Sequence, residues 1–506
     1  MSKSFARELV LGCLLLSCGA SRAAASPLFD LTGDVAGAGG LLARVMPSGS
    51  AATYFNPALL VASPADVEVG FLLVSQHIGV TLDGRQGRQF AVPRGVSNAG
   101  HADFSRFDNY PIPTSDLQNG REETNLIPGF DARPRQGAGT GDETFTYETF
   151  GLVVKLFQEH LALGVYGAIP NGTFTTLRAF YNDEREQYFT NSLHPELYGD
   201  RLTAPSIALG AGLRLSDDLT VGLGVSLNIE AEVVASTYVV DTGDLGKILI
   251  DMDGAVNVGL APHLGVSYAL GERVHLVATA HAPKQVELAT RFTFLLANGV
   301  EQASGVPLVL DYSPWQLALG GSFDLLETPE QTLSLGASVL YAMWSNYVDR
   351  HGDRPGKAFP WADTIAPTFG VRYRVHAFSA LLDGSFAPSP VPTQTGRSNY
   401  VDNHRISGAL AGELAFELFG SELHAGLMLQ AHHLIPRHHT KQPTPTDSTG
   451  ENLAPELVKD EVPDDAQRSG EPFPGAQGLQ TNNPGWPGFG SEGLVFASSL
   501  YLRVSI

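Results

Sequence analysis

The chain has 506 residues, of which 43% are hydrophobic, only 17% are charged, and 55 are glycine. A helical membrane protein is excluded, because no stretch of the body holds the ~20 uninterrupted apolar residues that a spanning helix needs. The 53 acidic and 32 basic residues leave a net charge of −21, which argues against nucleic-acid binding. This composition favours one large β architecture over several soluble domains.

The first 25 residues have the pattern of a secretory signal peptide. Lys3 and Arg7 precede an apolar run over 9–19, and three alanines follow at 23–25. A basic start, an apolar centre and a small-residue cleavage site are the three parts of such a signal. The sequence therefore predicts a signal peptide over 1–25 and an exported mature protein.

Both cysteines of the chain, Cys13 and Cys18, lie in this segment. Cleavage before Ser26 would remove them, so the mature protein would contain no disulfide. A second interpretation stays open, because residues 15–18 read Leu-Leu-Ser-Cys and loosely resemble a lipoprotein cleavage site. In that case a lipidated Cys18 would be the first mature residue.

The body of the chain alternates polar and apolar residues with the period of two expected of β-strands. Over 219–233, Thr, Gly, Ser, Asn and Glu occupy one face, and Val, Leu, Ile and Ala occupy the other. The pattern predicts fourteen strands, at roughly 65–80, 144–157, 161–174, 203–215, 219–236, 254–270, 273–297, 306–324, 331–348, 363–375, 377–391, 404–418, 422–436 and 491–506.

Every second connection between these strands is short, as at 158–160, and the others are mostly long and polar. The longest are 81–143, 175–202 and 437–490. Short turns on one side, long loops on the other and an even strand count are features of an outer-membrane barrel, whose closure leaves no strand edge unpaired in lipid. We therefore predict an all-β fold, a 14-stranded antiparallel transmembrane β-barrel over 65–506, in the outer membrane of a Gram-negative bacterium.

Four motifs occur in order along the chain. They are a Gly/Ala-rich segment over 33–60 that ends in Asn56-Pro57-Ala58, then Trp344-Ser345, then DGSFAPSPVP over 383–392, and finally Asp402-Asn403-His404-Arg405. In this order, behind a signal peptide, they make the chain resemble the outer-membrane long-chain fatty acid and hydrocarbon transporter family (FadL/TodX-like). The resemblance covers essentially the whole mature chain.

The resemblance implies a monomeric barrel whose lumen is plugged by an N-terminal hatch, here 26–64. It also implies passive uptake of a fatty acid or hydrocarbon, which is caught by outer loops, passed to an interior pocket and released sideways through the wall. The implied surroundings are outer-membrane lipid, lipopolysaccharide and the barrel-assembly machinery, with no cofactor. Such a short, Gly-rich hatch cannot form its own core and must pack against the barrel wall.

In this family the sideways release uses a kink in the third strand. Pro170-Asn171-Gly172 interrupts the predicted third strand, where Pro cannot donate to the ladder and Gly permits a bulge. An ordinary strand end is an equally compatible interpretation. Asn56-Pro57-Ala58 would form a rigid corner, and we hypothesise that Asn56 supplies the hydrogen bonds that the third strand loses at 170–172.

Candidate ligand residues combine an apolar start of the hatch with basic side chains on predicted lumen faces. They are Leu28, Phe29, Arg350, His351, Arg372, Arg374 and Arg405. Fatty-acid members of the family carry basic residues along the fifth strand, whereas this chain carries Glu230 and Glu232, so fatty-acid recognition does not transfer directly. The basic residues could instead pair with acidic wall residues such as Glu413 and Glu417.

The sequence holds no phosphate-binding GxxxxGK[ST], no HExxH and no GxSxG, so we expect no enzyme. A phospholipase would need a serine and a histidine that meet on one wall, and His404 and Ser407 are the available neighbours. Four histidines cluster near the end of the thirteenth strand, at His432, His433, His438 and His439. Adjacent strand residues point to opposite faces, so we expect no metal site there.

The predicted function is passive uptake of hydrophobic compounds across the outer membrane. The alternative is a surface-structural or adhesion barrel without transport activity, whose long acidic loops bind something outside the cell. Uptake of labelled oleate or toluene by cells that express the protein would separate the two hypotheses.

Overall fold

The computed structural model describes residues 27–37, 39–83, 138–172, 193–239, 248–296, 301–349, 352, 354–355, 360–396, 398–442 and 488–506. The predicted signal peptide, most of the three long loops, Arg350 and His351 lie outside these residues. Among the helices that are described, none is long and apolar enough to cross a membrane.

Most of the described chain forms strands. They are β1 (Asp66–Leu82), β2 (Ala138–Leu156), β3 (Leu161–Pro170), β4 (His194–Pro195), β5 (Ser206–Arg214), β6 (Leu219–Val239), β7 (Ile248–Leu270), β8 (Val274–His281), β9 (Lys284–Leu296), β10 (Glu301–Ser313), β11 (Gln316–Glu327), β12 (Gln331–Ala342), β13 (Thr364–Val375), β14 (Phe378–Ala387), β15 (Tyr400–Val401), β16 (Arg405–Leu418), β17 (Ser421–Thr440) and β18 (Gly488–Ser505).

The described helical segments are short and lie mostly before β1. They are α2 (Pro27–Thr32), η2 (Gly40–Leu42), η3 (Gly49–Ala51), α3 (Ala52–Phe55), η4 (Pro57–Val61), η6 (Gly199–Leu202) and η8 (Trp344–Asn346).

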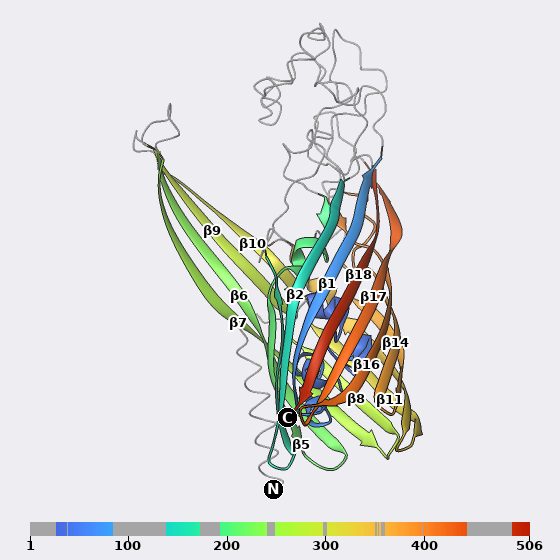
Figure 1. Ribbon diagram of the computed structural model, residues 1–506. Coiled ribbons are helices and arrows are strands. Elements are labelled where there is room, and N and C mark those ends of the chain that lie inside the picture. The colour runs from blue at the N-terminus through green and yellow to red at the C-terminus, as the bar shows by residue number, and fades with distance from the viewer. Residues whose placement is uncertain are drawn as a thin grey trace.

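Fourteen of the strands close into an antiparallel barrel (Figure 1). The first and last strands pair over their whole length, from Asp66 opposite Ser505 to Leu82 opposite Phe489. Pairing of β6 with β7 closes the circle on the far side. The predicted fold class and the number of wall strands are thereby confirmed.

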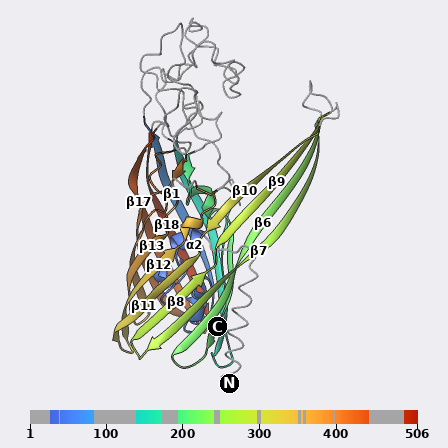
Figure 2. The ribbon, with the colours of Figure 1, turned by 180° about the vertical axis from the view of Figure 1, so that it is seen from behind.

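Two predicted strands are not continuous. The predicted strand 273–297 ends as β8 before Pro283 and resumes as β9, and the predicted strand 306–324 breaks at Pro314 between β10 and β11. Proline cannot donate to a ladder, so the chain turns there, and β9 pairs in parallel with the upper part of β6. We call β9, β10 and the upper parts of β6 and β7 the side extension; it leans away from the barrel (Figures 1 and 2).

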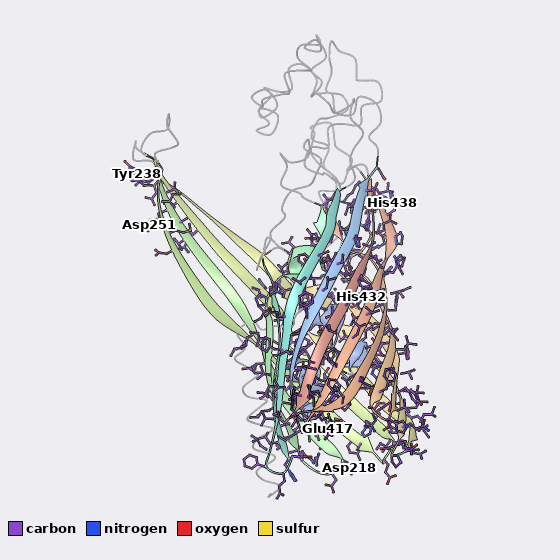
Figure 3. All side chains as sticks on the ribbon, viewed as in Figure 1. Asp218, Tyr238, Asp251, Glu417, His432 and His438 are labelled. Atoms are coloured by element: carbon purple, nitrogen blue, oxygen red, sulfur yellow. The ribbon has the colours of Figure 1, made fainter. Side chains whose placement is uncertain are left out.

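The short connections gather at one end of the barrel, which we call the short-turn end. Figure 3 shows Asp218 and Glu417 at this end, and His438 at the opposite end. The turn between β2 and β3 holds Phe157, Gln158 and Glu159 at positive φ. The short connections predicted between wall strands are thus observed, at 157–160, 215–218, 271–273, 328–330, 376–377 and 419–420.

The outer face of the wall is apolar. Val69, Leu319 and Leu500 are 55%, 68% and 63% exposed, respectively, although each lies in a regular strand. Soluble strands bury such side chains, whereas a barrel in lipid turns them outward. Lumen-facing positions on the same strands include the charged residues Glu68 and Arg503, together with apolar residues such as Leu72 that are buried against the N-terminal segment.

The N-terminal segment, residues 27–64, lies inside the barrel and is almost entirely buried. Its helix η4 contacts β5, β6 and β7, and η2 contacts β13, β14 and β16. Gly222 of β6 is paired directly with Gly265 of β7. A Cβ on Gly222 would overlap the Pro57–Ala58 backbone, and one on Gly265 would overlap the Asn56 side chain, so these glycines permit the close approach of the segment.

Candidate functional site

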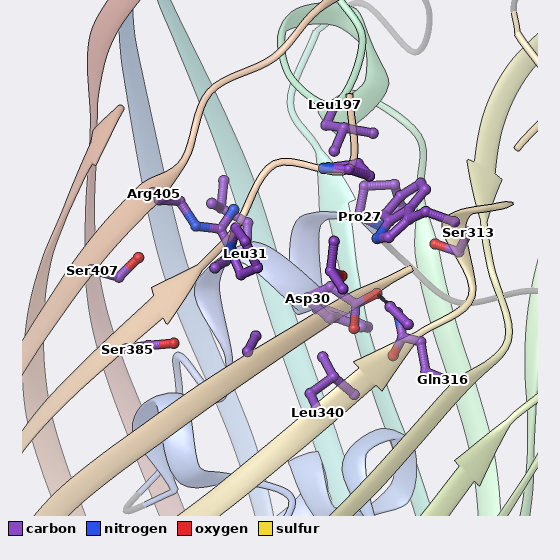
Figure 4. Close-up of a pocket in the computed structure, with 18 of the residues that line it drawn as sticks. Pro27, Asp30, Leu31, Leu197, Ser313, Gln316, Leu340, Ser385, Arg405 and Ser407 are labelled. Atoms are coloured by element: carbon purple, nitrogen blue, oxygen red, sulfur yellow. Dashed lines mark hydrogen bonds between the residues drawn. The ribbon is translucent and has the colours of Figure 1, made fainter. Parts of the chain in front are cut away.

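A cavity of about 180 Å³ lies between the N-terminal segment and the long-loop end of the barrel (Figure 4). We call it the upper cavity. Its apolar lining comes from α2, the connection before η6, and the inner face of β12. Examples are Phe29, Leu31, Leu197 and Leu340. The volume is close to the ~150 Å³ of an apolar cavity that binds benzene, so one aromatic ring or a short alkyl stretch fits.

The floor of the upper cavity is a polar network that ties the N-terminal segment to the wall. Arg44 forms an ion pair of 2.9 Å with Asp30 and donates to the Gln316 amide oxygen at 2.6 Å. The Gln316 amide nitrogen in turn donates to Asp30 at 2.6 Å. These groups satisfy one another, which buried polar groups require, so the floor is rigid rather than free to bind.

Arg201 borders the same cavity and is only 3% exposed. One terminal nitrogen donates to the Tyr347 hydroxyl at 3.1 Å and lies 3.6 Å from a Glu196 oxygen. Its Nε and the other terminal nitrogen have no partner within the described part of the chain. Leaving a buried cationic donor unbonded is costly, and an anion in the cavity would remove that cost.

Arg405 lines the cavity from the start of β16 and donates to the Tyr198 hydroxyl at 3.3 Å. Its Nε also lacks a partner among the described residues. Beside it, Asp402 is buried ahead of the strand, and burial raises the pKa of this carboxyl to about 6 against the opposing effects of Ser389 and Arg405. Burial likewise raises the pKa of the Tyr198 hydroxyl.

An aromatic cluster covers the cavity on the side of η8. The rings of Tyr347 and Trp361 stack at 3.6 Å with an interplanar angle of 4°. Tyr312, Trp344 and Tyr400 pack around this pair. The centroids of contacting rings in the cluster, other than the stacked pair, lie 5.3 to 6.3 Å apart. Each aromatic pair of this kind contributes about 0.5–1.5 kcal/mol beyond its buried area, which helps to hold the outer connections in place over the cavity.

The motifs that carried the sequence resemblance meet at this cavity. Trp344 lies in η8, Pro388 and Pro390 follow β14, and Asp402 and Arg405 precede and begin β16. All five line the upper cavity. Residues separated by more than forty positions in the sequence therefore form one site.

The predicted ligand residues divide among three places. Phe29 and Arg405 line the upper cavity, while Leu28 is buried in the adjoining apolar cluster. Arg372 and Arg374 line a second cavity of about 350 Å³ at the short-turn end, which we call the lower cavity. The sequence-based grouping of these arginines with Arg405 is therefore not what the structure shows.

Asn56 serves the N-terminal segment itself. Its side-chain oxygen accepts from the Ala58 amide at 3.2 Å and its amide nitrogen donates to the Arg44 carbonyl at 3.1 Å. The third wall strand, β3, ends at Pro170, and the Asn171 amide still donates to the Thr146 carbonyl at 2.7 Å. The hypothesis that Asn56 replaces hydrogen bonds lost by this strand is wrong, because the side chain of Asn56 lies against β7 instead.

The acidic residues of the wall also have definite places. Glu413 accepts hydrogen bonds from Arg503, Tyr501 and His424, whereas Glu417 is exposed at the short-turn end. Glu230 and Glu232 lie in β6, the fifth wall strand, and their side chains are outside the described structure. Arg372, one of the predicted arginines, is paired with Asp383.

The histidines have separate partners. Among the predicted neighbours, His404 accepts from the Ser389 amide at 2.9 Å, and Ser407 lies 2.8 Å from His432 instead. The clustered His438 and His439 contact Asp83 and the Gln394 amide, respectively, and His433 is exposed on the outer face. The described residues contain no group of three potential metal ligands.

Sequence analysis missed Arg201, Asp30 and Gln316. Arg201 falls at the end of the long connection 175–202, and Asp30 and Gln316 belong to no motif. The one available signal is the mixture of Leu197, Tyr198 and Arg201 next to a strand start, a composition that is more typical of a buried connection than of a solvated loop.

The structure is similar to the crystal structure of a Pseudomonas aeruginosa FadL homologue, with a TM-score of 0.51, 13% sequence identity and coverage of 96% of this chain and 99% of that chain. It also matches the P. putida toluene transporter TodX, with a TM-score of 0.46, 13% identity and coverage of 95% and 99%. The Ralstonia pickettii toluene transporter TbuX matches with a TM-score of 0.42, 11% identity and coverage of 95% and 98%. No protein-family profile and no curated protein matches the sequence.

At such low identity, the likeness to the FadL homologue establishes the fold alone. It extends over nearly the whole of both chains, as the resemblance of the ordered motifs predicted. With its fourteen-stranded wall around a buried N-terminal segment, the chain has the same fold as the FadL homologue.

Proposed function

We propose that this barrel takes up hydrophobic compounds passively across the outer membrane of a Gram-negative bacterium. The apolar outer face suits a lipid environment, and the upper cavity offers an apolar interior pocket on the long-loop side. The FadL homologue shares the fold over nearly the whole of this chain, which supports a transport role. The N-terminal segment acts as the hatch in this proposal.

The observation that carries the choice of substrate is the pair of unsatisfied nitrogens on buried Arg201. A neutral hydrocarbon would leave them without partners, whereas a carboxylate accepts two parallel bonds from a guanidinium. Arg405 adds a second cation on the same cavity. We therefore favour a hydrophobic acid, such as a fatty acid, over toluene as the preferred substrate.

Sideways release through the wall is part of the proposal. Beside the upper cavity, β8 ends at His281 and β11 begins at Gln316. Asp311 and Tyr312 of the intervening β10 line that cavity. A buried ion pair of 2.7 Å between Lys284 and Asp311 holds the base of the side extension. We place the release path beside this base rather than at 170–172.

The first test is uptake of labelled oleate or toluene by cells that express the protein, against cells that carry the empty vector. We expect faster uptake of oleate, and a smaller or no gain for toluene. Equal uptake of both compounds in the two strains would overturn the proposal and favour the adhesion barrel.

The second test concerns orientation. Protease added to intact cells should cleave within 437–490, since β17 ends at Thr440 and β18 begins at Gly488 on the long-loop side, and should leave 26–64 intact. Permeabilised cells serve as the control in which both segments are accessible. Cleavage of 26–64 in intact cells with 437–490 untouched would reverse the proposed topology.

A further inference from the structure

The lower cavity lies on the other side of the N-terminal segment from the upper one. Its volume of about 350 Å³ falls within the ~300–1,000 Å³ range of small-molecule sites. Met46 and Pro47 form its roof, and Leu381 and Ala411 line its wall. The interior of this cavity is therefore apolar and large enough for a short alkyl chain.

Most charged groups that line the lower cavity are already paired. Arg372 forms an ion pair with Asp383 and also donates to the Gly39 carbonyl. Glu413 accepts from Arg503, Tyr501 and His424. These groups are therefore structural, and none of them needs a ligand.

Arg374 differs from these groups. It lies two residues beyond Arg372 on β13 and so faces the lumen as well, at the exposed mouth of the cavity. Its one polar contact in the described structure is with the Thr332 hydroxyl at 3.1 Å, and no described carboxylate pairs with it. Ser379 lies directly opposite Arg374 in the register of β13 and β14, so a second hydroxyl borders the same mouth.

We propose that the lower cavity is a second ligand site, which binds an amphipathic carboxylate from the short-turn side. The carboxylate binds Arg374, Thr332 and Ser379 at the mouth, and the alkyl chain lies against Met46, Leu381 and Ala411. This site is separate from the upper cavity, and it goes beyond the proposed function because its occupancy does not require transport.

The test uses the purified full-length barrel in detergent and 8,8,8-trifluorooctanoate, whose fluorine resonance reports each bound environment by ¹⁹F NMR. We expect two bound resonances. Ala366→Phe, which fills the upper cavity, should remove one of them, and Ala411→Phe, which fills the lower cavity, should remove the other. The alcohol 8,8,8-trifluorooctan-1-ol should bind the lower site more weakly, since it lacks the charge.

Arg374→Gln provides the decisive variant, because Arg374 is exposed and its loss does not threaten folding. It should weaken trifluorooctanoate at the lower site by about 10-fold, the loss of one charge-assisted hydrogen bond, and leave the upper site unchanged. Arg214→Gln is the matched control, since Arg214 ends β5 at the same end of the barrel.

Two results would overturn the proposal. One is a single bound resonance that Ala366→Phe abolishes, which would leave only the upper site. The other is an unchanged lower-site affinity in Arg374→Gln. If the unmodified protein shows the lower-site resonance but no upper-site resonance, the proposed substrate of the upper cavity is contradicted and the lower site is not. The two proposals therefore fail separately.

Discussion

The two cavities of the lumen use arginine in opposite ways. In the upper cavity, Arg201 is buried and keeps two nitrogens without a described partner. In the lower cavity, Arg372 is paired with Asp383, and the available cation, Arg374, is exposed. Burial makes an unsatisfied donor discriminate strongly between ligands, whereas water substitutes readily at an exposed one. We therefore expect the upper cavity to be the more selective of the two, and the lower one to bind weakly and reversibly.

What separates the two cavities is a single turn of the N-terminal segment. Asp383 accepts from the Leu41 amide at 2.8 Å, and Gly40 adopts φ of +52° directly against this carboxylate. Arg372 holds the Gly39 carbonyl from the same side. The Arg372–Asp383 pair therefore clamps residues 39–42 as the partition between the cavities.

The largest effect should follow from breaking this clamp. Asp383→Ala removes the carboxylate that Arg372 pairs with, and loss of one member of a buried ion pair costs about 3–5 kcal/mol. We expect the partition to detach and permeability to small polar antibiotics to rise several-fold, measured by growth inhibition and by liposome swelling.

The control for this prediction is Arg372→Met/Asp383→Leu, which removes both charges and fills the space. It should leak less than Asp383→Ala, because no charge is left unpaired. Unchanged leakage in Asp383→Ala, with the barrel still folded by heat-dependent gel mobility, would show that the partition is held by other contacts.

A smaller effect is expected from Arg201→Leu, which sharpens the contrast in selectivity. Loss of one or two charge-assisted bonds of about 1.5–3 kcal/mol each should weaken binding of decanoate to the upper cavity by roughly 10- to 100-fold. Binding of toluene should stay the same. Arg201→Lys keeps the positive charge but cannot donate two parallel hydrogen bonds to a carboxylate, so it should recover part of the affinity. Equal losses for decanoate and toluene would instead mean that the variant collapses the cavity.

The affinity of the upper cavity for a carboxylate should depend on pH through the ionisation of Asp402. Its pKa is raised to about 6 by burial, so it is ionised at pH 7.5 and largely neutral at pH 5, while a simple alkyl carboxylate titrates near the Glu value of about 4.3. Decanoate should therefore bind several-fold more tightly as the pH falls from 7.5 to 5.5. The same shift means that the contribution of this group to stability is fully present below pH 3.8 and lost as pH rises through 6. Asp402→Asn should bind decanoate with a flat profile over this range.

The smallest effect is expected from Asn56→Ala. The wall hydrogen bonds dominate stability, so the barrel should stay folded, and loss of the cap on η4 costs about 1 kcal/mol. Because Asn56 also holds the Arg44 carbonyl, the floor of the upper cavity should loosen and hydrophobe uptake should fall a few-fold. Ser63→Ala, at the other end of η4, is the matched control. Normal uptake with raised leakage would refute a role for Asn56 in transport.

Much of the wall was predictable from the sequence, because alternation and turn residues are local signals. The departure of β9 was not, since the apolar alternation continues on both sides of Pro283 and does not reveal the break between β8 and β9. The lumen faces of Arg372 and Arg374 followed from the same alternation. The alternation does not show which cavity these two arginines line, because that depends on where residues 39–47 cross the lumen.

The site itself was predictable only in part. Trp344 and Arg405 belong to motifs with a fixed order, and both line the upper cavity. Arg201 depends on a connection that folds back into the barrel to reach Tyr347, a contact across 146 positions. No local pattern encodes such a contact, and an arginine near a loop looks solvated until its partners are known.

The glycine pair beneath the N-terminal segment bears on how the barrel is assembled. Gly222 and Gly265 bring no side chains to the lumen, so that part of β6 and β7 has little packing of its own. The backbone of 56–58 supplies the missing contact. Packing on this side of the wall is therefore completed by residues 56–58, so a larger side chain at either glycine would displace the N-terminal segment.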